Sequence, residues 1–368
     1  MIIQARTAIV EGNLRENLWL EITKGKIASV NDGIVERFDK YIAGLLIPGF
    51  IDMHCHGGGG KYFSAESHSD IEIAIATHRA HGTTSLCASL VTEPLAILIN
   101  QIKRLVPFSK SGEIVGIHLE GPYLAPTRCG AHDPKLLRLP AIEELETLIA
   151  AGEGHIKMVT IAPELDGAIP VIKHLVTSGV IVAIGHSAAD FEMTGRGVDA
   201  GATVITHFPN AVSKPDDPGQ TLANFAMIDP RVALELILDG HHVDDKTVKK
   251  IFAAASGRTV LITDAMCAAG SLDGNYSIGA LPVSVKNGVA RLTSNGVLAG
   301  STLTMDQAFF NMHSLQGYSL AQAVAATSTI AARVIGLADR GEIAVGMKAD
   351  LLEANISTGQ ISVVPSGE

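Results

Sequence analysis

The segment IPGFIDMHCH, residues 47–56, marks the point at which the pattern of the sequence changes. Before it, short β-like segments follow one another without a helical period. From Pro48 onward, short apolar runs alternate with longer stretches of helical period. Such alternation is typical of parallel α/β proteins, in which a helix crosses over between neighbouring strands. The segment is therefore predicted to form the first strand of a parallel sheet.

Eight candidate strands follow from this pattern, over residues 47–53, 84–90, 114–119, 156–161, 180–184, 203–206, 233–238 and 259–262. Candidate helices lie between them, over residues 70–80, 93–105, 142–151, 167–177, 188–200 and 244–255. Eight βα units predict an α/β fold in which the sheet closes into a (β/α)₈ barrel of the TIM type. Residues 271–300 interrupt the pattern and predict a hairpin insertion, and two helices are expected over 305–314 and 320–334.

Both ends of the chain have a β-like pattern. Residues 1–47 contain four short β segments separated by turn residues, and residues 341–364 return to the same pattern. We expect the two ends to pair into one small β-sandwich domain. The predicted division is residues 1–47 and 341–368 for that domain and 48–340 for the barrel.

The composition restricts the classes of partner. Apolar residues make up 47% of the 368 residues, which is enough for a large core. The net charge of −10 and the absence of Lys/Arg runs argue against nucleic-acid or membrane-surface binding, so a phosphate would need a local cationic pocket. No apolar run approaches the ~18 residues of a membrane span. With no signal-peptide pattern and no C-x-x-C pair among four cysteines, the protein is predicted to be cytoplasmic, with reduced thiols.

Residues suited to metal binding follow several predicted strands. In the first strand, His54 and His56 share one face because side chains alternate along a strand. Glu120 ends the third strand, and His186 and His207 follow the fifth and sixth. Each alone could be a capping carboxylate or a satisfied interior histidine. Because barrel enzymes gather their chemistry at the carboxyl ends of the strands, the set indicates a catalytic zinc-type site with an open position.

An acid also follows the eighth strand. Asp264 could accept a proton from a water bound to such a metal. A helix cap or a structural salt bridge is the alternative role. Gly57 to Gly60, directly after the first strand, are predicted to form a turn beside the site, since no Lys–Ser/Thr sequence of a phosphate-binding loop follows them.

Seven motifs together resemble, in order, those of the N-acetylglucosamine-6-phosphate deacetylases of the amidohydrolase superfamily. They are PGFIDMHCHGG, HLEGPYLAPTRCGAHDP, IGHSAA, THFPNAV, DGHHV, ITDAM and LAGSTLTMDQAF. The resemblance runs from about Pro48 to Ala332, which is nearly the whole barrel. It implies hydrolysis of the acetamide of N-acetylglucosamine-6-phosphate to glucosamine-6-phosphate and acetate in amino-sugar catabolism, by a homodimer.

The resemblance also implies residue roles. Glu120, His186 and His207 would hold the main divalent ion, and His54 and His56 would support a second metal position. Zinc is the first expectation, with iron, cobalt or manganese also suited, at one or two ions per subunit. Asp264 would be the general base and then the general acid. The implied substrate contacts are Ala131, His132, Asn210, Ala211, His242, Leu298, Ala299 and Gly300.

One motif departs from the family. After the sixth strand such enzymes carry a REPG-like segment whose Arg reaches the phosphate in the partner subunit, whereas this chain has KPDDPG over residues 214–219. Two acids beside a phosphate dianion would repel it. Three interpretations remain open: Lys214 substitutes, the phosphate is held differently, or the substrate lacks a phosphate.

Other functions remain as alternatives. These are deacetylation of N-acetylgalactosamine-6-phosphate or of an unphosphorylated sugar, and hydrolysis of N-acyl-amino acids. Cyclic-amide hydrolases use a carboxylated Lys at the end of strand four, and here only Lys157 lies on that strand, near its start. A non-catalytic sugar-phosphate sensor would be expected to lose ligands or the strand-eight acid, and all are present.

Overall fold

A computed structural model describes residues 1–366 of the chain. Its central sheet has eight strands in the order in which they occur along the chain, and every neighbouring pair is parallel. The strands are β5 (Phe50–Cys55), β8 (Thr83–Leu90), β9 (Gly116–Glu120), β10 (Ile156–Ile161), β11 (Ile181–Ile184), β12 (Val204–Ile205), β13 (Ala233–Ile237) and β14 (Thr259–Ile262). The predicted (β/α)₈ barrel is confirmed.

The first and last strands of the barrel are joined near their carboxyl ends. The Asp264 backbone N–H donates to the His54 carbonyl oxygen at 2.9 Å. The Thr263 hydroxyl donates to Asp52 Oδ2 at 2.6 Å. Burial raises the pKa of Asp52 to about 6, although the bonds from Thr263 and His54 oppose that rise. These contacts fix the two strands that carry His54 and Asp264 relative to each other.

Seven helices follow strands of the barrel: α1 (His68–Ala80), α2 (Leu95–Lys110), α3 (Ile142–Ala151), α4 (Ala168–Thr177), α5 (Phe191–Asp199), α6 (Leu222–Ile228) and α7 (Asp245–Ala255). Helix α6 was not expected, because its seven residues are too few to show a helical period. Thr221 and Asn224 define its start with a capping box. The helix expected over 305–314 begins as α8 (Met305–Phe310) and continues as a π-helical turn. The helix expected over 320–334 consists of α9 (Leu320–Val324) and α10 (Ile330–Val334), with a second π-helical turn between them.

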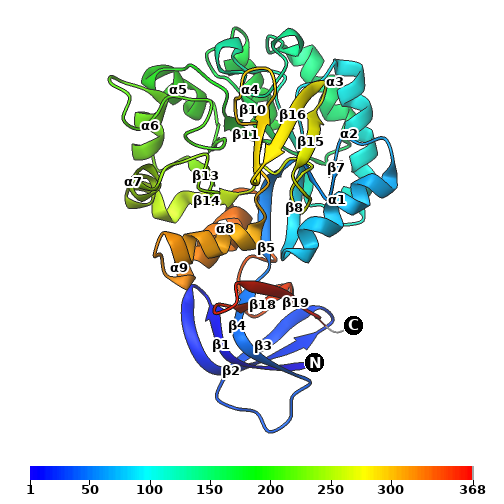
Figure 1. Ribbon diagram of the computed structural model, residues 1–368, viewed down its shortest axis with the longest axis vertical. Coiled ribbons are helices and arrows are strands. Elements are labelled where there is room, and N and C mark those ends of the chain that lie inside the picture. Colours follow the sequence, from blue (N-terminus) through cyan, green and yellow to red (C-terminus); the bar gives the residue numbers. More distant parts are fainter. Residues whose placement is uncertain (367–368) are drawn as a thin grey trace.

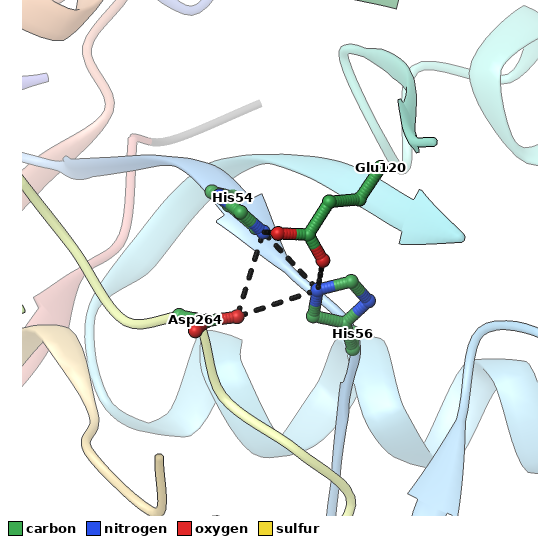
Figure 2. Close-up of side chains that lie close together, drawn as sticks. All are labelled: His54, His56, Glu120 and Asp264. Carbon is green, nitrogen blue, oxygen red and sulfur yellow. Dashed lines mark hydrogen bonds and ion pairs between the residues drawn. The ribbon is translucent and has the colours of Figure 1, made fainter. Parts of the chain in front are cut away.

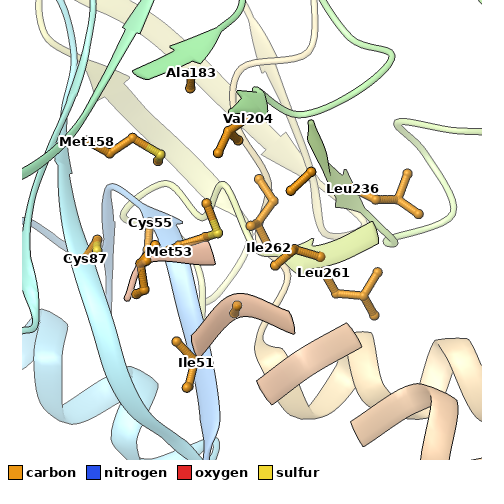
Figure 3. Close-up of a cluster of buried hydrophobic side chains, with 14 of the residues drawn as sticks. Ile51, Met53, Cys55, Cys87, Met158, Ala183, Val204, Leu236, Leu261 and Ile262 are labelled. Atoms are coloured by element: carbon orange, nitrogen blue, oxygen red, sulfur yellow. The ribbon is translucent and has the colours of Figure 1, made fainter. Parts of the chain in front are cut away.

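The core of the barrel is built from strand side chains that face either its interior or the surrounding helices. Figure 3 shows part of it, with Ile51 on β5, Met158 on β10 and Ile262 on β14. All three are fully buried. Parallel strands covered on both faces need continuous apolar runs, which is why these segments lack the alternation of a half-exposed strand.

The two ends of the chain form a second sheet. Its strands are β1 (Ile2–Val10), β2 (Asn13–Thr23), β3 (Lys26–Asp32), β4 (Lys40–Pro48), β18 (Leu351–Asn355) and β19 (Gln360–Val364). They lie in the order β19-β18-β4-β1-β2-β3, and in Figure 1 they sit together at one end of the molecule, in blue and red. A separate apolar cluster that includes Ile3, Leu18 and Leu351 fills this region. Pairing of the chain ends is as predicted; residues 367–368 of the C-terminal part lie outside the described residues.

The insertion after β14 lies within the predicted residues 271–300 but has one strand more than predicted. It forms three antiparallel strands, β15 (Gly274–Ile278), β16 (Leu281–Lys286) and β17 (Val289–Leu292), where a single hairpin was expected. The Asn287-Gly288 turn, with both residues at positive φ, is a two-residue hairpin turn that adds the third strand. Gly57–Gly58 and Lys61–Tyr62 form the short β6/β7 hairpin, so that only Gly59 and Gly60 of the predicted turn Gly57–Gly60 form the turn itself. Along the described chain, none of the helices combines the length and apolarity that crossing a membrane requires.

Candidate active site

Four polar side chains gather where the barrel strands end. Glu120 is the last residue of β9, and His186, His207 and Asp264 each follow their strand by two residues. All four are buried. Because the strands are parallel, their carboxyl ends meet at one mouth of the barrel, so residues far apart in the sequence come together there.

The backbone at three of these positions adopts an uncommon conformation. His186, His207 and Asp264 have φ values of 48°, 31° and 47°, in the left-handed region. A residue with a side chain pays roughly 1–3 kcal/mol for such a conformation unless its surroundings hold it there. The chain therefore leaves these strands through strained turns, a feature that clusters at active sites.

Glu120 brings two histidines together. The His186 and His207 Nε2 atoms lie 3.1 and 3.0 Å from Glu120 Oε1 and 3.0 Å from each other. The other ring nitrogen of each faces an oxygen that can only accept: His186 Nδ1 is 2.8 Å from the Arg128 carbonyl, and His207 Nδ1 is 3.2 Å from the Asn210 carbonyl. Both Nδ1 atoms must therefore carry hydrogen.

This assignment has a consequence for the neutral rings. With hydrogen on Nδ1, the Nε2 lone pairs of both histidines point at each other and at an anionic carboxylate. Three acceptors then face one another within about 3 Å without a proton between them. Such a set is repulsive unless a cation sits among them, and two imidazoles with one carboxylate are suitable ligands for a divalent metal. The donor set thus fits a metal ion.

The second oxygen of Glu120 faces a further set of ligands, shown in Figure 2 with His54, His56 and Asp264. His56 Nε2 lies 3.2 Å from Glu120 Oε2 and 3.3 Å from Asp264 Oδ1. His54 Nε2 lies 3.4 Å from Asp264 Oδ1 and 3.1 Å from His56 Nε2. The ligand atoms of all four residues lie within 4.8 Å of one another, which is close enough for them to share a metal ion.

The charges in this cluster balance one another. Burial lowers the pKa of His54, but Glu235, Glu120 and Asp264 outweigh it and hold that pKa well above its usual value. Burial opposes ionisation of Glu120 and Asp264, yet the neighbouring histidines keep the pKa of both carboxyls below their usual values. The site therefore holds anionic carboxylates that attract positive charge at this position.

Glu235, on β13, is a site residue that sequence reasoning missed. It is fully buried, and its Oε2 accepts from His54 Nδ1 at 3.0 Å and from the His207 backbone N–H at 3.0 Å. A carboxylate behind a histidine fixes the tautomer in which Nε2 is free for a metal. The available signal was an acid inside the apolar segment ALELIL, residues 233–238, where an unpaired charge would be costly.

A cavity of about 490 Å³ opens above the cluster. Most residues predicted to contact substrate line it: Ala131, His132, Asn210, Ala211, His242, Leu298 and Gly300. Ala299 does not; it is fully buried and packs with the apolar side chains beneath the inserted sheet. Gly300 has φ 62°, and a Cβ there would lie 2.9 Å from the Asp264 carbonyl oxygen, so the close approach requires glycine.

His132 is oriented differently from the other histidines. Its Nδ1 receives the Thr92 backbone N–H at 3.4 Å and lies 3.0 Å from the Thr92 hydroxyl. Because a backbone N–H can only donate, Nδ1 is the acceptor and the hydrogen resides on Nε2. His132 Nε2 lies 3.4 Å from Glu120 Oε2, so this ring presents a donor to the site.

Comparison with known proteins agrees with this architecture. The chain is 37% identical to an N-acetylgalactosamine-6-phosphate deacetylase of Escherichia coli O157:H7, over 91% of this chain and 90% of the relative. It is 34% identical to an N-acetylglucosamine-6-phosphate deacetylase of Bacillus subtilis (strain 168), over 96% and 92%. Among solved structures, a mutant N-acetyl-D-glucosamine-6-phosphate deacetylase from Mycobacterium smegmatis, in complex with N-acetyl-D-glucosamine-6-phosphate, superposes with a TM-score of 0.96 at 40% identity, covering 100% of this chain and 98% of that one.

The fold is thus shared with a solved N-acetyl-D-glucosamine-6-phosphate deacetylase. A model of the amidohydrolase family matches residues 45–355, which include every strand of the barrel and every ligand of the cluster. This chain belongs to the amidohydrolase family.

Proposed function

We propose that this protein hydrolyses the acetamide of N-acetylglucosamine-6-phosphate to glucosamine-6-phosphate and acetate, in amino-sugar catabolism. The observation that carries the proposal is the convergence of Glu120, His186 and His207 on one point, with Asp264 at the same opening. The Mycobacterium smegmatis structure supports the substrate, since that protein is complexed with N-acetyl-D-glucosamine-6-phosphate.

Glu120, His186 and His207 would hold the main divalent cation, and His54 and His56 would support a second one. A bound cation lowers the pKa of a water molecule toward neutrality and polarises the acetyl carbonyl. Zinc is our first choice, because imidazole and carboxylate ligands suit it, and iron, cobalt and manganese also fit this ligand set.

Asp264 moves the proton. Its Oδ1 lies at the cluster and its side chain lines the cavity, so it can take a proton from the attacking water. As the C–N bond of the amide breaks, the same carboxyl returns that proton to the departing sugar amine, and the water oxygen remains in the acetate. The low pKa of Asp264 keeps it ionised at the start of the reaction, against the effect of burial.

His132 stabilises the developing negative charge on the acetyl oxygen. With its Nδ1 occupied by Thr92, the ring can donate only from Nε2, which faces the site. A donor fixed in advance stabilises the transition state without reorganising during the reaction. Asn210, Ala211, Leu298 and Gly300 form the cavity wall that would hold the sugar.

Deacetylation of N-acetylgalactosamine-6-phosphate is a second candidate. It is favoured by the 37% identity to the Escherichia coli O157:H7 protein that carries this name. The chemistry would be the same, since the two sugars differ in configuration at one hydroxyl. Assembly into a homodimer and a cytoplasmic location remain predictions.

Acetate release tests the proposal directly. Metal-loaded protein is incubated with N-acetylglucosamine-6-phosphate, N-acetylgalactosamine-6-phosphate and unphosphorylated N-acetylglucosamine, and metal content is measured on the same sample. We expect the first substrate to be cleaved with the highest kcat/KM. A higher kcat/KM for the galactosamine epimer would favour the second candidate, and no acetate from any of the three would refute both.

A further inference from the structure

A continuous chain of hydrogen bonds crosses the barrel interior one layer below the ligand cluster. Ser89 Oγ accepts from the Cys55 backbone N–H at 3.0 Å and lies 2.9 Å from His118 Nδ1. His118 Nε2 lies 2.9 Å from Thr160 Oγ1, and that oxygen lies 3.0 Å from Thr206 Oγ1. All five residues are buried. We call the side chains of Ser89, His118, Thr160 and Thr206 the polar belt.

The polar belt lies where a barrel normally has apolar side chains. The inner layers of such barrels are filled mainly by bulky branched residues. Two positions before Thr160 and Thr206 stand Met158 and Val204, which belong to the apolar core (Figure 3). Replacing both partners of a buried hydrogen bond by apolar groups of the same shape can leave stability unchanged. A hydrogen bond, however, fixes distance and direction. The belt is therefore suited to set a geometry.

Three of the metal-ligand candidates lie next to the first half of the belt. Cys55, whose N–H bonds to the belt, stands between His54 and His56. His118 precedes Glu120 by two residues on β9, so both side chains point to the barrel interior. The His118 ring also meets the His54 ring edge to face, with centroids 4.5 Å apart. A shift of this half of the belt would move all three candidates.

The other two candidates lie next to the second half. Thr206 directly precedes His207, and Gly185 directly precedes His186. Gly185 packs against the link between Thr160 and Thr206, because a Cβ at this position would lie 2.9 Å from Thr160 Cγ2 and 2.6 Å from Thr206 Cβ. The strand that carries His186 can therefore approach the belt only because position 185 has no side chain.

Glu235 closes the chain of bonds into a ring. Its Oε2 accepts from the His207 backbone N–H and lies 3.0 Å from His54 Nδ1. Since His207 follows Thr206 and His54 precedes Cys55, hydrogen bonds and peptide links together form a closed circuit around the barrel interior. In a closed circuit no segment can move without straining its neighbours, so the relative positions of the ligand side chains are fixed from below.

We propose that the polar belt, with His118 and Thr160 at its centre, positions the metal ligands, so that His118 and Thr160 are positioning residues for the hydrolysis. The inference rests on the proposed function, since it concerns the ligands of the proposed metal ion. Such side chains must be held within about 0.5 Å of their working geometry. His118 and Thr160 act through the ends of the strands, by fixing where Glu120 and His207 stand.

Thr160→Val tests the proposal, because valine keeps the branched shape and removes the hydroxyl that joins His118 to Thr206. Full-length protein loaded with Co²⁺ is titrated with a chelator, so that the readout does not depend on the reaction. We expect affinity for Co²⁺ to fall by about 10- to 100-fold. The absorption bands of bound Co²⁺ should shift, because their energies depend on the arrangement of the ligands. Thr160→Ser, which keeps the hydroxyl, should restore most of both.

Thr259→Val is the matched control. Thr259 is also fully buried in the barrel, but it begins β14, at the end away from the ligands, and its hydroxyl donates to the Ala255 carbonyl at 2.9 Å. We expect Thr259→Val to lower the melting temperature while Co²⁺ affinity and absorption stay as in the wild type. On N-acetylglucosamine-6-phosphate, Thr160→Val should lower kcat with KM little changed, because the belt lies under the ligands and not in the wall that holds the sugar.

Ser89→Ala tests the other half of the belt and replaces Thr160→Val if that variant does not fold. The same loss of Co²⁺ affinity is expected. Wild-type affinity and absorption in the folded belt variants would overturn the inference. An equal loss of affinity in Thr259→Val would also overturn it, because the belt would then only stabilise the fold. If the wild type binds Co²⁺ but releases no acetate, the proposed function fails, and the Co²⁺ measurements still decide the inference.

Discussion

The two ends of the barrel differ in whether their polar groups have bonding partners within the chain. Where strands β12 and β13 begin, a cavity of about 560 Å³ is lined by Arg258 and Arg231, among others. Arg258 donates to the carbonyls of Ala226, Met227 and Val232 at 2.7–2.8 Å, and Arg231 pairs with Asp229 and Asp199. At the carboxyl ends of the strands, acceptors face acceptors, as at the Nε2 atoms of His186 and His207, which lie 3.0 Å apart.

The difference separates structural from functional polar residues. Groups whose partners come from their own chain stabilise the fold, because burying them costs little once they are bonded. Buried polar groups that have no hydrogen-bond partner, or whose acceptors face other acceptors, lower the stability of the fold unless a bound ligand supplies the partner. Each variant below tests whether its residue belongs to the first set or to the second.

The largest effect is expected for Asp264→Asn at the mouth. Loss of the carboxylate that moves the proton should lower kcat by roughly 10²- to 10⁴-fold. The protein should keep its main metal ion and melt at the same temperature or higher, since the charge serves the reaction and not the fold. Turnover close to that of the wild type would contradict the role of Asp264.

A smaller effect, on metal affinity, is expected for Glu235→Gln. This residue is both structural and functional. Its carboxylate has partners in its own chain, but they are the ring of one metal ligand and the backbone of another. We expect metal affinity to fall by about 10- to 100-fold, measured by competition with a chelator. Glu164→Gln is the matched control, because that carboxylate bonds to Ser187 and Ala188 but to no ligand ring. Equal metal affinity in the two variants would remove Glu235 from the site.

At the opposite end, Arg258→Met should affect stability and leave catalysis almost unchanged. Three carbonyls lose their donors, so we expect the free energy of unfolding to fall by about 1–3 kcal/mol, with kcat/KM close to that of the wild type. Denaturant unfolding measures the change. Arg231→Met, which breaks exposed pairs, should cost less. A large loss of activity without a loss of stability would show that Arg258 serves the reaction and not the fold.

The smallest effect is expected at the pair of His81 with Asp306, whose atoms Nδ1 and Oδ2 lie 2.8 Å apart. The bond to Asp306 raises the pKa of His81, so the pair stabilises the fold fully below about pH 6.5, the unfolded value, and the effect is lost as the pH rises through the folded value. His81→Gln should therefore cost ~0.5 kcal/mol at pH 6 and less at pH 9, allowing for the half-exposed position. The same cost at both values would contradict this assignment.

Much of the fold could be predicted from the sequence, because the eight apolar segments and their helical spacers repeat one unit. The largest error, at residues 271–300, came from a turn that adds one strand without a change in composition. Helix α6 was missed because its signal is a cap and not a period. Both features depend on single residues that a pattern of hydrophobicity does not record.

The site could be predicted in part for a related reason. Residues that end a strand or follow it closely, such as Glu120 and His207, can be placed from the topology of the barrel once the strands are known. Glu235 cannot, since it lies inside a strand and its importance depends on which atoms face it. The left-handed backbone at His186, His207 and Asp264 could not be predicted either, because none of these positions is a glycine or an asparagine.

The two hydrogen bonds that Glu235 accepts limit how this protein can change during evolution. One carboxylate serves the ring of His54 and the backbone of His207, which belong to distant parts of the chain. A lineage that replaced His54 would be left with an acid in the barrel interior lacking its ring partner, so substitutions at positions 54 and 235 are expected to occur together. Homologues that keep only one of the two metal positions should differ at both.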